Sequence, residues 1–145
     1  MDVREIGRLL KQLSDKMEAT ANADLKKLDL TIAQSRVLLY LDERDEKRAS
    51  QRELEEHLDV SHATVHGILA RMEAKGLVQM STSPKDRRMR IVQLNINDHT
   101  LCEVRAQQQE HMSKITQGLD TEALFETVQT MLDNHTKYLV NREDD

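Results

Sequence analysis

The stretch from Ser61 to Leu94 constrains the fold of this chain most, because a short helical pattern runs directly into a basic hairpin. Gly76 stands where a left-handed residue ends a helix, and Ser61 is placed to cap the first turn. The segment between them, SHATVHGILARMEAKG, carries four apolar side chains at helical spacing on one face: Val65, Ile68, Leu69 and Met72. This pattern predicts one amphipathic helix.

An alternating, strand-like pattern follows that helix. Val78 and Met80 alternate with polar residues, STSPKD has the composition of a turn, and RRMRIVQL returns as a second strand. A helix that fits a groove, followed by a cationic hairpin that can follow a phosphate backbone, is the plan of a winged helix-turn-helix. We therefore expect double-stranded DNA as a partner.

The charge distribution supports this expectation, although the net charge of the chain is −5. Residues 1–60 carry a net charge of −3, residues 61–95 carry +4, and residues 96–145 carry −6. Charges farther apart than roughly 8–10 Å are screened at physiological salt, so the local patch sets the field at a docked duplex.

The composition favours a single helical domain in a reducing compartment. The chain has 145 residues, with 4 Gly, 1 Pro and 2% aromatic residues, which is typical of a mostly helical protein. One cysteine excludes an internal disulfide framework. No apolar run reaches membrane-spanning length and no signal segment opens the chain, so we expect a cytoplasmic protein without a membrane partner.

Capping patterns divide the central part of the chain into helices. Thr31 and Gln34 have the spacing of a capping box and open a second helix, and a charged connector, residues 42–49, follows it. Ser50 and Glu53 form another capping box before a short helix. A break at residues 59–60 then gives the tight corner of a helix-turn-helix. Residues 31–95 are thus predicted to form the DNA-binding domain.

Long helices flank this domain. The first is predicted over about residues 3–21, a long one begins after a cap at Asn97 or Asp98, and a last one follows a break at residues 118–121. The first and last helices carry apolar stripes, and the central module is too small to cover both of them. We therefore predict that residues 1–30 and 96–145 form a dimerisation region, and that the chain is a homodimer. The fold class is mostly α with a small β-wing.

Four pieces of the sequence, in order and in register, resemble the MarR (multiple antibiotic resistance regulator) family of bacterial transcription factors. The pieces are Leu30-Thr31-x-x-Gln34-x-x-Val37-Leu38, Ser61-x-x-Thr64-Val65, Arg71-Met72-Glu73-x-Lys75-Gly76-Leu77-Val78 and Asp86-Arg87-Arg88-x-x-x-Val92-x-Leu94. The resemblance implies a homodimeric winged-helix protein, usually a repressor, that binds pseudo-palindromic promoter DNA and is released by a small-molecule effector or an oxidant.

The resemblance also implies roles for individual residues. The helix from Ser61 would enter the major groove, and the turn from Asp86 to Arg90 would reach the adjacent minor groove. Asp86 and Arg88 would support the wing, and Arg88 would also contact DNA. The chain departs from the family pattern at Gly67, where Arg or Lys is frequent, and at Ala70, where an acidic residue is frequent.

The chemistry of the side chains on the helix from Ser61 and on the basic hairpin also indicates contact with DNA. Cations on the turn can neutralise phosphates, and hydroxyls and imidazoles at a helix N-terminus can bond phosphates or base edges. For Val65 we favour packing, since it begins the apolar stripe. The full set of predicted DNA-contacting residues is Ser35, Arg36, Ser61, His62, Thr64, Val65, His66, Arg71, Lys85, Arg87, Arg88 and Arg90, with Asp86 as wing support.

Catalysis, metal binding and redox sensing find less support in the sequence. His62 and His66 have the i, i+4 spacing of zinc ligands, but no Cys, His or acidic cluster accompanies them, so we expect neither a metal nor a cofactor. No phosphate loop or nucleophile motif occurs, which argues against an enzyme. Cys102 is predicted to be half-buried and passive.

Two other functions remain open from the sequence alone. An activator would use the same DNA contacts as a repressor, and a reporter assay with a deletion would separate them. A winged helix can also dock another protein. The affinity for DNA falls log-linearly with salt, whereas an apolar protein interface is much less sensitive to it.

Overall fold

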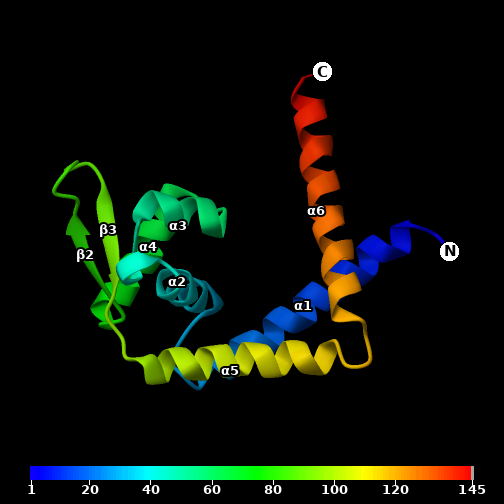
Figure 1. Ribbon diagram of the computed structural model, residues 1–145, viewed down its shortest axis with the longest axis horizontal. Helices are drawn as coiled ribbons and strands as arrows, with labels where there is room; N and C mark the ends of the chain where they lie inside the picture. The colour runs from blue at the N-terminus through cyan, green and yellow to red at the C-terminus, as the bar shows by residue number, and fades with distance from the viewer. Residues whose placement is uncertain (145) are drawn as a thin grey trace. The chain divides into compact units, whose positions relative to one another are not determined.

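The computed structural model describes residues 1–144 and has the predicted class, a mostly helical chain with a small antiparallel sheet (Figure 1). The chain divides into two compact units, Met1–Gln108 and Gln109–Asp145, which are described separately. The elements in chain order are α1 (Arg4–Lys26), α2 (Ile32–Asp42), the 3₁₀ turn η1 (Asp45–Lys47), β1 (Arg48–Ser50), α3 (Gln51–Leu58), α4 (His62–Ala74), β2 (Val78–Thr82), β3 (Arg90–Leu94), α5 (Asp98–Ile115) and α6 (Thr121–Glu143).

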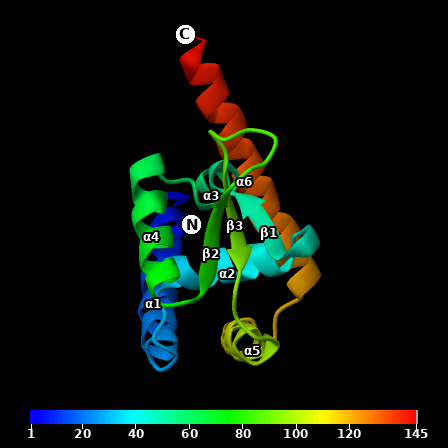
Figure 2. The same cartoon turned by 90° about the vertical axis from the view of Figure 1, so that its left-hand side faces the viewer.

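The wing is a three-stranded sheet in which β3 lies between β1 and β2 (Figure 2). Val92 of β3 pairs with Ala49 of β1 and Met80 of β2, both antiparallel. The sequence pattern predicts β2 and β3 but misses β1, because its three residues, at the end of a charged connector, are too few to show alternation. β3 begins at Arg90, whereas the sequence pattern predicts a strand from residue 87. Residues 87–89 belong to the turn instead.

Local sequence signals set the helix boundaries of this region. Thr31 and Ser50 each complete a capping box, as predicted, with the side chain accepting from the backbone N–H three residues on. The Oγ of Ser61 accepts from the N–H of Thr64, and α4 ends before Gly76, whose φ of +75° is left-handed. These caps fix where α2, α3 and α4 begin, and hence which faces they turn inward.

One apolar core holds α2, α3, α4 and the sheet together, and the first half of α5 packs on it. Val104 and Leu101 of α5 are at most 1% exposed and join this core. So do the following side chains, none of them more than 1% exposed: Val37, Leu38, Leu41, Leu54, Val65, Leu69, Met72, Val78 and Val92. Burying one such side chain stabilises a fold by about 1.5–3 kcal/mol, so this core fixes the geometry of the winged region.

An ion-pair cluster ties α2 to α5. The carboxylate of Asp42 is 6% exposed and lies 2.8 Å from Nζ of Lys47, and it also pairs with the guanidinium of Arg105. A buried carboxylate needs such partners, since its desolvation is costly. The contact anchors the first half of α5 to the winged region.

α1 is longer than predicted and continues to Lys26, where Leu25 is buried. Its predicted apolar stripe is largely exposed in the single chain, with Leu9 at 54%, Leu10 at 43% and Leu13 at 47%. The segment 18–24 lacks large apolar side chains, so no apolar stripe in the sequence marks this last part of the helix.

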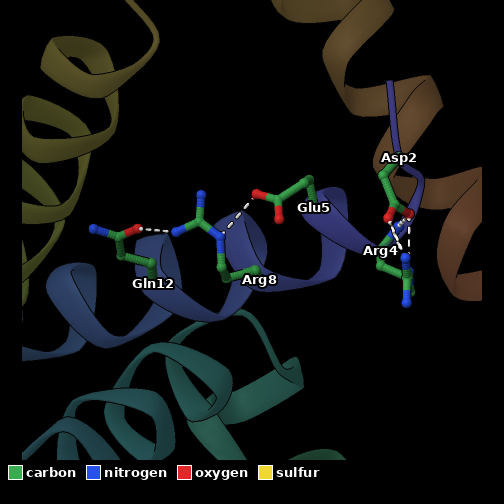
Figure 3. A network of polar contacts seen from close by, with 5 residues as sticks. All are labelled: Asp2, Arg4, Glu5, Arg8 and Gln12. Carbon is green, nitrogen blue, oxygen red and sulfur yellow. Dashed lines mark hydrogen bonds and ion pairs between the residues drawn. The ribbon is translucent and has the colours of Figure 1, made fainter.

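A polar network covers the other side of the first turns of α1 (Figure 3). Arg4 donates to the carboxylate of Asp2, and these hydrogen bonds hold the pKa of Asp2 below its usual value. Arg8 donates through Nε to Glu5 at 2.9 Å and through Nη1 to Gln12 at 3.4 Å. α1 is therefore amphipathic, with a solvated polar face and an apolar face that the described chain leaves open.

The second unit consists mainly of α6. Gly118, with φ of +80°, makes the predicted break, and Asp120 caps the helix by accepting from the N–H of Ala123 at 3.1 Å. Residues 141–143 are helical and belong to α6, and Asp145 lies outside the described residues. The apolar face of α6 is exposed: Phe125, Val128, Met131, Leu132, Tyr138, Leu139 and Val140.

Candidate nucleic-acid interface

α3 and α4 form the helix-turn-helix, and one left-handed residue sets the corner between them. Asp59 has φ of +53°, and its N–H donates back to the carbonyls of α3. The corner therefore lies where the sequence predicted it. α4 then turns Val65, Ile68, Leu69 and Met72 toward the core. Its first turn and its opposite face remain exposed.

Hydroxyls and imidazoles gather at the exposed start of α4. Ser61, His62, Thr64 and His66 are all exposed. The rings of His62 and His66 stack with their centroids 6.4 Å apart, and the Oγ of Ser61 lies 2.9 Å from Oγ1 of Thr64. A helix N-terminus presents unpaired N–H groups and a partial positive charge, so this turn is suited to anions.

Two of the predicted DNA-contacting residues belong to the core instead, and we correct both. Val65 is fully buried, as the packing interpretation held, because it lies on the inner face of α4. Ser35 is 1% exposed, and its Oγ donates to the carbonyl of Ile32 at 2.7 Å. Arg36, the next residue along α2, is exposed.

Arg71 lies one turn beyond Gly67 on α4, and its guanidinium folds back over that glycine. A Cβ at Gly67 would lie 3.6 Å from Nη1 of Arg71. The resemblance noted in the sequence implies that Arg or Lys is frequent at position 67. In this chain the cation beside that position comes from Arg71, which is itself exposed.

The turn of the wing is built by its own backbone and by Asp86. The Oδ1 of Asp86 accepts from the N–H of Arg88 at 3.0 Å, and the Asp86 carbonyl accepts from the N–H of Met89 at 3.0 Å. The N–H of Ser83 donates to the carbonyl of Met89 at 2.8 Å and closes the base of the turn. The carboxylate of Asp86 therefore accepts its hydrogen bond within the turn, and four cationic side chains lie at neighbouring positions.

Those four cations, Lys85, Arg87, Arg88 and Arg90, are exposed. Within residues 1–144 none of the four has a carboxylate close enough for an ion pair. Exposed cations that are not already paired are the groups that can neutralise phosphates and release counterions. The wing therefore has the chemistry of a surface for a polyanion.

Sequence reasoning missed one contact at this surface. Glu55 of α3 accepts a hydrogen bond from Nδ1 of His62, and Gln51 lies beside both. The six residues between Glu55 and His62 include the left-handed corner at Asp59, so no helical or strand spacing relates the two side chains. Only the packing of α3 on α4 brings them together.

The described residues lack a cluster of metal-ligating side chains, and their cysteine is exposed. Within the part of the chain that the structure describes, no three His, Cys, Asp or Glu side chains are arranged to hold a metal ion. Cys102 is exposed on α5, which corrects the expectation that it is half-buried. None of the helices within residues 1–144 has the length and apolar character that a bilayer crossing requires.

Comparison with known proteins identifies the family. The MarR family profile matches residues 28–89, which run from the end of α1 to the wing turn. The HTH-type transcriptional repressor NicR of Pseudomonas putida is 33% identical over 118 residues, which cover 81% of this chain and 73% of NicR.

Two solved structures extend the likeness beyond the matched segment. A mutant MarR of Escherichia coli complexed with operator DNA is 25% identical with a TM-score of 0.70, over 92% of this chain and 98% of that one. BpsR of Bordetella bronchiseptica, solved to explain how 6-hydroxynicotinic acid regulates its DNA binding, is 24% identical with a TM-score of 0.74, over 88% and 98% of the two chains.

The family consists of regulators and not of enzymes, in agreement with the missing catalytic motifs. The helix-turn-helix, the basic wing and the flanking helices described above are the parts that such a regulator needs. This chain belongs to the MarR family of DNA-binding transcriptional regulators.

Proposed function

We propose that the protein is a ligand-responsive repressor that binds pseudo-palindromic promoter DNA as a homodimer. The observation that carries this proposal is the pairing of two features in one chain. The start of α4 presents exposed polar side chains and the wing presents exposed cations that make no ion pair within residues 1–144, while α1 and α6 present exposed apolar faces. The first feature fits DNA, and the second fits another copy of the chain.

In the proposed complex α4 enters the major groove. Ser61, Thr64, His62 and His66 lie at its exposed first turns, where recognition helices contact base edges and phosphates. The exposed guanidinium of Arg71 follows on the same helix, and Arg36 of α2 is available to a backbone phosphate.

The wing would lie along the adjacent minor groove. Arg88 is the side chain we assign to the groove itself, because its backbone N–H is held by Asp86 within the turn and its side chain is exposed. All four cations would neutralise phosphates, Arg88 from within the groove and Lys85, Arg87 and Arg90 on both sides of it. Each neutralised phosphate adds about 0.9 to the slope of log affinity against log salt.

The dimer follows from the apolar faces that one chain leaves open. Leu9 and Leu13 of α1 and Phe125 and Leu132 of α6 are each 47–69% exposed, which is unusual for large apolar side chains in register on a helix. A two-fold axis would bury both faces and place two copies of α4 one helical turn apart, about 34–36 Å.

Repression and release by a ligand are proposed from the relatives. NicR is a repressor, and DNA binding by BpsR is regulated by 6-hydroxynicotinic acid. An effector that binds the dimer with a preference of about 1–3 kcal/mol for a spacing unsuited to DNA would give a useful response. As a regulator of bacterial promoters, the protein would act in the cytoplasm.

A gel-shift series on promoter DNA from its own locus tests this function. We expect the full two-fold site to bind at least about 100-fold more tightly than a single half-site, because only the full site engages both copies of α4. A reporter assay gives the sign: deletion of the gene raises expression if the protein is a repressor and lowers it if it is an activator. A panel of small aromatic acids that includes 6-hydroxynicotinic acid tests release.

A further inference from the structure

A carboxylate on α3 holds the first side chain of α4. The Oε1 of Glu55 accepts from Nδ1 of His62, and the Glu55 side chain is only 20% exposed, whereas that of His62 is 74% exposed. One end of the imidazole is therefore anchored to the body of the helix-turn-helix, and the rest of the ring faces outward.

This contact fixes the proton on the ring. An ionised carboxylate only accepts hydrogen bonds, so Nδ1 must carry the hydrogen. Gln51, 4% exposed, directs its Nε2 at the same place, 3.4 Å from Oε1 of Glu55 and 3.4 Å from Nδ1 of His62. With a hydrogen on Nδ1, the amide can donate only to Glu55, which holds that carboxylate in place.

We propose that Glu55 is a positioning residue for base recognition, which turns His62 so that Nε2 is the one ring nitrogen presented to DNA. The inference rests on the proposed DNA interface, because it gives His62 a partner in the major groove. With the ring neutral, Nε2 is an acceptor and fits the amino groups of cytosine or adenine. With the ring protonated, Nε2–H is a donor and fits O6 and N7 of guanine.

Electrostatic repulsion alone predicts that removal of Glu55 tightens DNA binding, whereas a positioning role predicts that it weakens binding. The sign of the change in affinity therefore distinguishes repulsion from positioning. A carboxylate near DNA repels phosphate, so its loss alone would tighten binding. Glu56 is the matched control, because it is the next residue on α3, carries the same charge, and pairs with Arg52 at 3.6 Å and not with His62.

The experiment uses fluorescence anisotropy on a duplex selected by the wild-type protein from a random-sequence pool. E55A removes the acceptor, and we expect roughly tenfold weaker binding, within the range that one base contact contributes. E55Q keeps an acceptor at the same place without the charge, and we expect it to bind within about twofold of wild type. E56Q is likewise expected to change the affinity less than about twofold.

A double variant shows whether Glu55 acts through His62. In an H62A background, E55A is expected to cause no further loss, because the ring that it positions is gone. The inference is overturned if E55A binds like wild type, or if E55A weakens H62A by the same factor as it weakens wild type. Wild type that binds no duplex would instead overturn the proposed function together with this inference. Matching thermal unfolding of the variants confirms that each is folded.

Discussion

Replacing Arg88 and Arg90 by alanine tests the wing most sharply, because the salt dependence of DNA binding counts the contacts that are lost. Both side chains are exposed, and neither makes an ion pair within residues 1–144, so the R88A/R90A variant is expected to fold as wild type does. Two cations are lost in each chain and four in each dimer. At about 0.9 per phosphate, the slope of log affinity against log salt should become shallower by about 3.6.

This difference is large enough to measure directly. Between about 50 and 200 mM salt, a slope difference of about 3.6 means that wild type loses roughly 150-fold more affinity than the variant does. Fluorescence anisotropy at four or five salt concentrations gives both slopes. R4A/R8A is the matched control, since it removes two arginines from the polar network of α1 and changes the net charge equally. A variant slope equal to that of wild type would refute the role of the wing.

Three further changes separate structural from DNA-contacting residues. D86A removes the acceptor of the Arg88 N–H, and we expect faster hydrogen exchange in the wing turn and weaker DNA binding at nearly unchanged unfolding temperature. V65A truncates a fully buried side chain, and urea unfolding should show that the free energy of unfolding falls by about 1.5–3 kcal/mol. H66A changes the exposed neighbouring residue, so it should weaken DNA binding and leave the free energy of unfolding within about 0.5 kcal/mol of wild type. L132E places a charge on the apolar face of α6, and sedimentation should show a shift toward monomer; an unchanged dimer would contradict the use of that face.

The features that sequence predicted well are those that depend on a few neighbouring residues. The capping boxes at Thr31 and Ser50, the cap at Ser61 and the left-handed Gly76 are local arrangements, and each is present as predicted. The apolar face of α4 also follows from helical spacing alone, which is why the packing of Val65 was foreseen.

The features that sequence missed depend on residues far apart in the chain. β1 exists because β3 pairs with it, and its own three residues carry no strand pattern. The burial of Ser35 depends on how α2 packs, and its hydroxyl finds a partner within its own helix. The Glu55–His62 contact depends on the corner at Asp59, so neither side chain alone predicted it.

The number of chains on one duplex tests the central claim most directly, because the account requires two copies to hold two recognition helices against one site. Native mass spectrometry of the complex with a selected two-fold duplex gives this number without a fit. We predict two chains per duplex, and two chains in the free protein at micromolar concentration. One chain per duplex, or a monomer that binds half-sites as tightly as full sites, would contradict the account.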